Sequence, residues 1–217
     1  MDDFLRHRAA KPLAFVLSLL PFVWLGYAAV ADQLGANPTE ALVRATGDWT
    51  LRFLCLVLAV TPLRVLAGWP ALARLRRMLG LFVYFYAVLH LLSYAWFDMG
   101  FALDEVARDI AKRPFILVGF SAFLLLTPLA FTSSNRAVRW LGARRWLALH
   151  RLVYAIAGLA LLHFFWMRAA KNNFAEVAVY AVILGVLLSW RLSRAVSRSA
   201  TGRPRSRAGE SDVPVRR

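Results

Sequence analysis

The residues of this sequence best suited to metal chemistry are its four histidines, His7, His90, His150 and His163. An imidazole nitrogen binds transition metals and haem iron, and the ring is costly to bury in hydrocarbon. Three of the histidines lie inside long apolar runs, whereas His7 lies in a polar segment and is expected to be solvated. A histidine inside a membrane-spanning segment is a candidate functional residue.

The spacing places His90 and His163 at similar depths. If the apolar runs 79–97 and 147–167 enter the membrane from the same side, both rings fall in its outer half. Their depths then differ by about 4.5 Å of helical rise. A haem held by one histidine from each of two helices requires this arrangement. The alternatives for each ring are a hydrogen-bonded packing role or a proton relay.

His150 fits this arrangement less well. It precedes His163 by 13 residues, which is about 19.5 Å along an ideal helix and about 140° around its axis. Either the run 147–167 bends near Gly158, or His150 faces a different neighbour. We expect His150 to be a further haem ligand or to hydrogen-bond a propionate, a quinone or a flavin at the inner face.

The elements that must position these rings are helices that cross a membrane. Hydrophobic residues make up 60% of the 217-residue chain and are concentrated in runs near 20 residues long, a length that spans a bilayer. The runs are 12–31, 49–68, 79–97, 114–131, 147–167 and 174–192. They predict an all-α membrane protein, a six-transmembrane-helix bundle with haem between helices three and five.

The basic residues predict the orientation of the bundle. The formal net charge is +15, but most of the 27 Lys and Arg residues flank apolar runs on one side, so we do not expect nucleic acid as a partner. With six spans, both termini are then cytoplasmic. The predicted parts are a cytoplasmic N-terminal segment at 1–11, the membrane domain at 12–192 and a disordered basic tail at 193–217.

Two further features limit the possible classes. Residues 29–31 resemble a signal-peptidase site, but the first run is longer than a typical signal sequence, so we expect a retained helix. Cys55 is the single cysteine, which excludes an internal disulfide. We expect its side chain to be buried and to pack as a small hydrophobic group.

Other residues could contribute to cofactor binding. Among the inner basic residues, Arg77 and Arg151 are the predicted cofactor-binding arginines, for propionates or a flavin phosphate. Further candidates of the same kind are Arg76, Arg144 and Arg145. The sequence contains no GxGxxG, Walker, HExxH or CxxC motif, and we expect no attached soluble domain, so nicotinamide or substrate chemistry is expected from a partner chain.

Several stretches taken together, in order and with their loop lengths, resemble the MsrQ (YedZ) family within the ferric-reductase-like transmembrane group. The resemblance covers about residues 10–192. The stretches are TGDW at 46–49, TPLR at 61–64, RMLGL at 77–81, DIAKRP at 109–114, TPLA at 127–130 and LHRLVY at 149–154.

The resemblance implies b-type haem on histidines that match His90, His150 and His163, together with FMN, whose binding residues it does not place. It also implies electron transfer across the bacterial inner membrane, with the quinone pool or a cytoplasmic flavin reductase as donor. The acceptor would be the periplasmic molybdopterin reductase MsrP, which repairs methionine sulfoxide in periplasmic proteins. The chain would then be an electron-transfer subunit rather than the catalytic subunit. The alternatives are a stand-alone ferric or oxygen reductase and a haem-free structural or transport protein.

Overall fold

The computed structural model describes residues 2–169 and 174–201, and all regular elements in these residues are helical. Six helical segments in this part of the chain are long and apolar enough to cross a membrane. They are α2 (Ala10–Val30), α3 (Pro38–Leu66), α4 (Arg76–Ser93) with the π-helical turn η2 (Tyr94–Asp98), α6 (Pro114–Phe131), α7 (Asn135–His150) with α8 (Val153–Ala169), and α9 (Ala175–Thr201). The predicted all-α, six-span architecture is confirmed.

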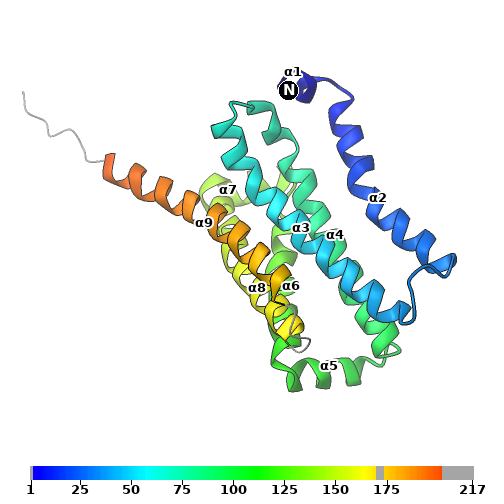
Figure 1. The fold of residues 1–217 in the computed structure, drawn as a ribbon. Helices are drawn as coiled ribbons and strands as arrows, with labels where there is room; N and C mark the ends of the chain where they lie inside the picture. Colours follow the sequence, from blue (N-terminus) through cyan, green and yellow to red (C-terminus); the bar gives the residue numbers. More distant parts are fainter. Residues whose placement is uncertain (1, 170–173, 202–217) are drawn as a thin grey trace, which may run out of the picture.

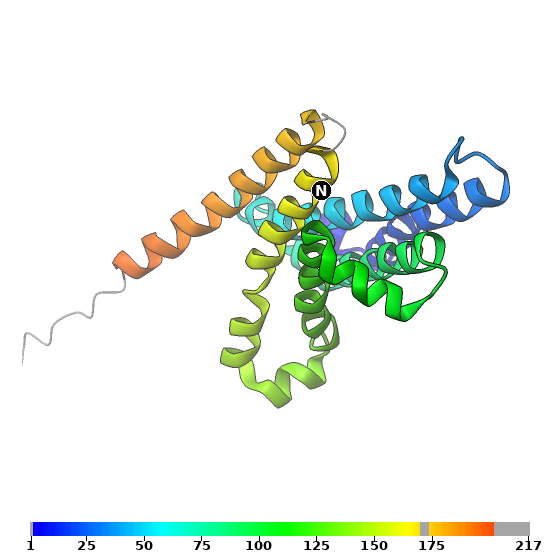
Figure 2. The ribbon, with the colours of Figure 1, turned by 90° about the horizontal axis from the view of Figure 1, so that it is seen from below.

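Two antiparallel helix pairs form the centre of the bundle, namely α3 with α4 and α6 with α8. In Figure 1, α2 lies along one edge of the molecule and α9 along the opposite edge. Figure 2 shows α8 between α6 and α9. Most large apolar side chains of α2 and α9 are exposed, as expected for helices that face lipid rather than water.

The core between α2, α3 and α4 is aromatic. Phe53 on α3 stacks on Tyr86 of α4 with ring centroids 5.2 Å apart, and the Tyr86 side chain is fully buried. Its hydroxyl donates to the Ser18 carbonyl (2.8 Å) and accepts from the Phe22 amide (3.2 Å). The hydroxyl thus inserts between a carbonyl and the amide four residues later in α2, which joins α2 to α4 through a satisfied polar contact.

Three short or early helical segments were not predicted. α3 begins at Pro38 rather than near Trp49, because the Asn37 side chain accepts from the Glu40 amide (3.1 Å) and caps the helix in the predicted polar loop. The loop after η2 contains the amphipathic helix α5 (Leu103–Lys112). The basic loop after α6 is helical as α7, with a break at Gly142, whose φ is 73°.

The boundaries of the last two spans also differ from the prediction. The run 147–167 is not one helix, because α7 ends at His150 and α8 begins at Val153 after a turn. α9 continues to Thr201, so residues 193–201 of the predicted disordered tail are helical. The rest of that tail lies outside the described residues.

Two small elements cover the end of the bundle at which α2 and α4 begin. They are α1 (Asp2–Arg6) and the 3-10 turn η1 (Pro70–Arg74). The Asp2 carboxylate accepts from the Ala71 amide (3.0 Å) and joins them. Hydrogen bonding to Ala71, with help from Arg6, holds the pKa of Asp2 below its usual value.

Candidate functional site

The structure brings His90 of α4 and His163 of α8 together. Their ring centroids are 6.1 Å apart and the ring planes are inclined by 72°. The two rings therefore lie close together between helices three and five, as the matched depths predicted. A metal ion lies about 2.0 Å from each coordinating imidazole nitrogen, so this separation suits two rings that share one metal ion.

A backbone carbonyl from a neighbouring helix fixes each ring. His90 Nδ1 donates to the Val43 carbonyl of α3 (2.9 Å), and His163 Nδ1 donates to the Phe115 carbonyl of α6 (2.7 Å). A carbonyl oxygen only accepts hydrogen bonds, so the proton of each neutral ring is on Nδ1. The lone pair of each Nε2 is then available to a metal, which is the arrangement that metal-binding histidines generally have.

A glycine gives each ring access to its carbonyl. A Cβ added at Gly47 would lie 3.1 Å from the His90 ring, and one added at Gly119 would lie 2.8 Å from the His163 ring. Gly47 follows Val43 by four residues, and Gly119 follows Phe115 by four. Since residues i and i+4 lie on one helix face, each ring packs where a side chain would otherwise cover the carbonyl. The same local arrangement thus occurs twice.

The paired rings are positioned by α3, α4, α6 and α8 together. Their donor set fits haem: two neutral imidazoles with ring centroids 6.1 Å apart would supply nitrogen ligands to its iron. Within residues 2–169 and 174–201, no group of three His, Cys, Asp or Glu side chains is placed to hold a metal ion. A site with two protein ligands suits a metal that brings its other ligands with it, as haem iron does.

An ion cluster lies at the same end of the bundle. Arg168, five residues after His163, is only 6% exposed and its guanidinium lies 3.5 Å from the Asp48 carboxylate. It also pairs with Glu176 at 2.5 Å and lies over the Phe164 ring at 5.1 Å. These contacts join α8 to α3 and α9. This cluster was not predicted from the sequence.

His150 lies in a different setting from the other two membrane histidines. It is the last residue of α7 and its ring stacks on Trp146 with centroids 3.9 Å apart. His150 Nδ1 lies 3.1 Å from the Trp146 carbonyl of its own helix. Trp146 is fixed in turn because its Nε1 donates to the Thr132 carbonyl (2.8 Å). The turn after α7, rather than a bend near Gly158, separates His150 from His163.

The predicted arginines lie in different surroundings, and two of them, Arg76 and Arg151, lie near His150. Arg77 contacts the Asn135 amide oxygen at the start of α7, and Arg151 is exposed. Arg191, which was not predicted, reaches from α9 to the Leu58 carbonyl (2.8 Å), the Thr61 hydroxyl (3.2 Å) and the Tyr154 hydroxyl (3.3 Å). His7 is exposed, as expected, and accepts from the Ala9 amide (3.2 Å).

The elements that sequence analysis missed at the histidine pair had weak signals. Gly47 lies in the TGDW stretch, and only its offset from Val43 distinguishes it. Gly119 lies in an apolar run with no neighbouring polar residue before Ser121. Backbone carbonyl acceptors have no side-chain signature, so Val43 and Phe115 could be found only from coordinates.

The chain is similar to membrane proteins of known families. Residues 46–162 match the ferric reductase like transmembrane component family, so the bundle is a ferric-reductase-like transmembrane domain. It is 74% identical over 191 residues to a protein of Polaromonas naphthalenivorans named protein-methionine-sulfoxide reductase heme-binding subunit MsrQ, covering 88% of this chain and 87% of that protein. The chain belongs to the MsrQ family.

More distant relatives carry the same name. A protein of Herminiimonas arsenicoxydans is 54% identical over 182 residues, covering 84% of each chain. One from Rhodospirillum rubrum is 50% identical over 198 residues, covering 91% of this chain and 94% of that protein. No solved structure matches the chain.

Proposed function

We propose that the protein binds haem b between α4 and α8, with His90 and His163 as the residues that would hold its iron. The observation that carries this proposal is the 6.1 Å ring pair with both Nδ1 atoms bonded to carbonyls, which leaves both Nε2 atoms free. The printed name of the MsrQ relatives, a heme-binding subunit, supports the choice of haem.

Haem would supply one-electron chemistry inside a bilayer that water and ions do not cross. The protein's own residues hold the rings in one tautomer and one orientation through Val43 and Phe115. The aromatic core around Phe53 and Tyr86 packs against the histidine-bearing helix α4 and excludes water. This combination describes an electron-transfer subunit rather than a catalytic subunit.

The proposed orientation follows from the basic residues. Arginine and lysine concentrate at the end of the bundle where α2 and α4 begin, which the positive-inside rule assigns to the cytoplasm. The protein then crosses the bacterial inner membrane with both termini cytoplasmic. His90 and His163 lie toward the periplasmic end, where the acceptor would be MsrP, the periplasmic molybdopterin reductase that repairs methionine sulfoxide in periplasmic proteins.

The cytoplasmic end would receive electrons, from the quinone pool or a cytoplasmic flavin reductase. His150 is the candidate ligand there, either to a further haem or through a hydrogen bond to a propionate, a quinone or a flavin such as FMN. Arg77 and Arg151 remain candidates for anionic groups of these cofactors. Arg191 joins them, because its contacts with Leu58, Thr61 and Tyr154 are all to neutral groups.

The test is a reduced-minus-oxidised spectrum of the purified protein with haem and flavin quantification. We expect the spectrum of low-spin haem. In proteoliposomes, the reduced haem should become oxidised when MsrP and a methionine sulfoxide substrate are added. A colourless preparation from haem-replete cells would instead support a haem-free structural or transport protein.

A second candidate is a stand-alone ferric or oxygen reductase, which the ferric-reductase-like match favours. In that case the purified chain, supplied with a chemical reductant, would reduce ferric chelates or oxygen catalytically without MsrP. Turnover that depends on MsrP would exclude this candidate as the main activity.

A further inference from the structure

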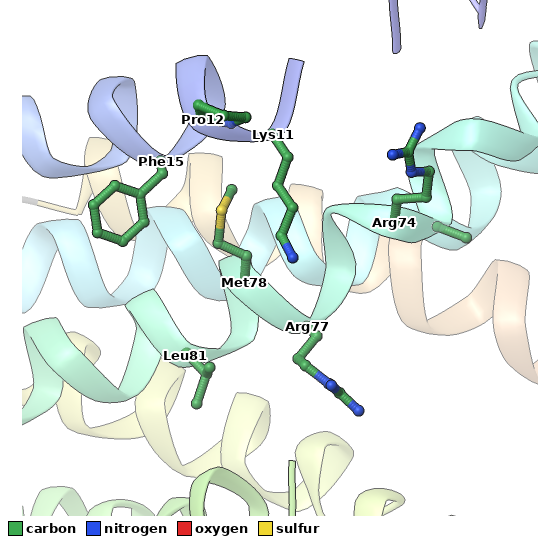
Figure 3. Close-up of a pocket in the computed structure, with 8 residues that line it drawn as sticks. Lys11, Pro12, Phe15, Arg74, Arg77, Met78 and Leu81 are labelled. Atoms are coloured by element: carbon green, nitrogen blue, oxygen red, sulfur yellow. The ribbon is translucent and has the colours of Figure 1, made fainter. Parts of the chain in front are cut away.

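A cavity of about 590 Å³ opens at the end of the bundle where α2 and α4 begin. Its basic lining residues are Lys11 of α2, Arg74 of η1 and Arg77 of α4, and its apolar lining residues include Phe15, Met78 and Leu81. Figure 3 shows the cationic groups toward one side of this cavity and the apolar side chains toward the other. We call it the basic cavity.

The order of these residues along the helices explains this division. α2 and α4 both begin at this end and run in the same direction through the bundle. On α2, Lys11 precedes Phe15 by one turn, and on α4, Arg77 precedes Leu81 by one turn. The cations therefore lie at the membrane surface and the apolar residues one turn deeper. In a phospholipid of the bilayer, the headgroup likewise lies at the membrane surface and the acyl chain lies deeper.

The charges of the basic cavity are not neutralised by contacts with acidic residues in the described part of the chain. Arg74 Nη1 donates to the carbonyls of Leu5 (3.4 Å) and Arg6 (3.0 Å), and Arg77 contacts the Asn135 amide. Lys11 makes no ion pair among the described residues. The nearby Asp2 carboxylate accepts from Arg6 and from the Ala71 amide instead.

We propose that the basic cavity binds one anionic phospholipid, with its phosphate among Lys11, Arg74 and Arg77 and an acyl chain along Phe15, Met78 and Leu81. Three cations without acidic partners favour a headgroup of net negative charge over a zwitterionic one. The N-terminal ends of α2 and α4, which have no side-chain caps, add positive dipole ends at the same place. This site is separate from the histidine pair and goes beyond the proposed haem function.

The test is titration of the full-length protein in detergent with short-chain phosphatidylglycerol and phosphatidylcholine, with bound lipid counted by native mass spectrometry. Lys11→Gln should weaken phosphatidylglycerol binding about fivefold, and Lys11→Gln with Arg74→Gln about 25-fold, since each charge near an anionic headgroup is worth about 1 kcal/mol. The matched control is Arg139→Gln with Arg144→Gln, which removes two exposed charges of α7 outside the basic cavity.

Three other outcomes would each overturn the proposal that the basic cavity binds an anionic phospholipid. Equal weakening in the α7 control would mean general surface attraction, and equal affinity for phosphatidylcholine would mean an apolar groove without headgroup recognition. Competition by FMN or inorganic phosphate at similar concentrations would assign the cavity to a soluble phosphate compound. Because Arg74 also bonds to α1, Lys11→Gln alone decides the matter if the double variant is unstable. An unchanged haem spectrum in that variant separates this result from the haem proposal.

Discussion

The two ends of the bundle hold their histidines in different ways. At the proposed periplasmic end, or outer end, His90 and His163 come from two helices and bond to the carbonyls of two others, at 2.9 and 2.7 Å. At the inner end, His150 stacks on Trp146 and its Nδ1 contacts the backbone of its own helix. The outer rings are fixed by the tertiary structure, whereas the inner ring is fixed mainly by local structure.

This difference predicts different tolerance to change. A ring whose Nδ1 bonds to the backbone of a neighbouring helix is preorganised for a ligand, since its tautomer is fixed before binding. A ring held within one helical turn keeps its position only as long as α7 does, and α7 is interrupted at Gly142. We therefore expect the outer site to bind its cofactor more tightly and the inner site to be more sensitive to detergent and lipid.

The largest expected effect comes from removing the outer rings. His90→Ala or His163→Ala should abolish most haem absorbance, because each removes one of the two proposed haem ligands and its partner ring cannot compensate. His150→Ala should leave the absorbance of the outer site in place. The measurement is the Soret band per protein, with His7→Ala as the matched control on an exposed ring.

Unchanged spectra in both outer variants would refute the ligand assignment. An equal loss of haem absorbance in His150→Ala would show instead that the two ends form one cooperative site. The two ends would then not differ in how they hold their histidines.

A smaller effect is expected from filling the space beside the outer rings. Gly119→Ala places a methyl group 2.8 Å from the His163 ring and should displace the ring from the Phe115 carbonyl. Loss of such a hydrogen-bond partner typically lowers metal affinity about 10- to 100-fold. Gly47→Ala should be milder, because its 3.1 Å contact is relieved by a shift of a few tenths of an ångström.

The matched control for both glycines is Gly158→Ala on α8, whose added Cβ would meet nothing within 4 Å. Haem content and the midpoint potential measure the effect, since a displaced ligand changes the potential even where haem is retained. An order of effects with Gly158→Ala as the most harmful variant would contradict this account of the site.

The ion cluster at the outer end should affect stability more than cofactor affinity. Arg168→Gln leaves the carboxylates of Asp48 and Glu176 without their shared partner, and breaking a buried ion pair costs about 3–5 kcal/mol. Because the Glu176 side chain is 51% exposed, we expect about 2–3 kcal/mol. Thermal unfolding in detergent gives the measurement.

The control is Arg108→Gln, which breaks an exposed pair with Asp104 on α5 and should cost under about 1 kcal/mol. If the two variants were equally stable, the buried ion cluster would stabilise the outer end no more than an exposed ion pair does.

Much of the fold was predictable because a bilayer imposes simple rules on sequence. The six spans, and the facing of His90 and His163, followed from run lengths and depth. The break after His150 did not, because residues 147–167 are uniformly apolar apart from His150, Arg151 and His163 and include no glycine or proline at the turn. The sequence spacing of His150 and His163 nevertheless indicated correctly that the two rings do not lie on one face of a single helix.

The polar segments were predicted less well than the spans. The early start of α3 depends on the Asn37 cap, whereas α5 has no side-chain cap and packs against α6. Neither feature can be read from the loop-like composition of these segments. The carbonyls of Val43 and Phe115 carry no sequence signature. Run lengths and depth therefore identified the rings but not the backbone groups that orient them.

The smallest expected effect concerns the exposed contact that closes the inner end. Asp2 accepts from the Ala71 amide and from Arg6, so its pKa is lowered in the folded protein. A lowered carboxylate pKa stabilises the folded state above the ordinary value of about 3.9, and this contribution disappears as the pH falls through the lower, folded value. Protection of the Ala71 amide from hydrogen exchange, corrected for intrinsic rates, should therefore decrease as the pH falls below about 4.

Asp2→Asn should abolish this pH dependence, whereas Asp104→Asn in the exposed pair of α5 should leave it unchanged. Because Asp2 and Arg6 lie at the surface, the change in protection should be about twofold and should shrink in high salt. A pH dependence that persists in Asp2→Asn would show that another group closes the inner end. The inner end would then be held by more than this local contact, and it would differ less from the outer end, which is held by contacts between helices.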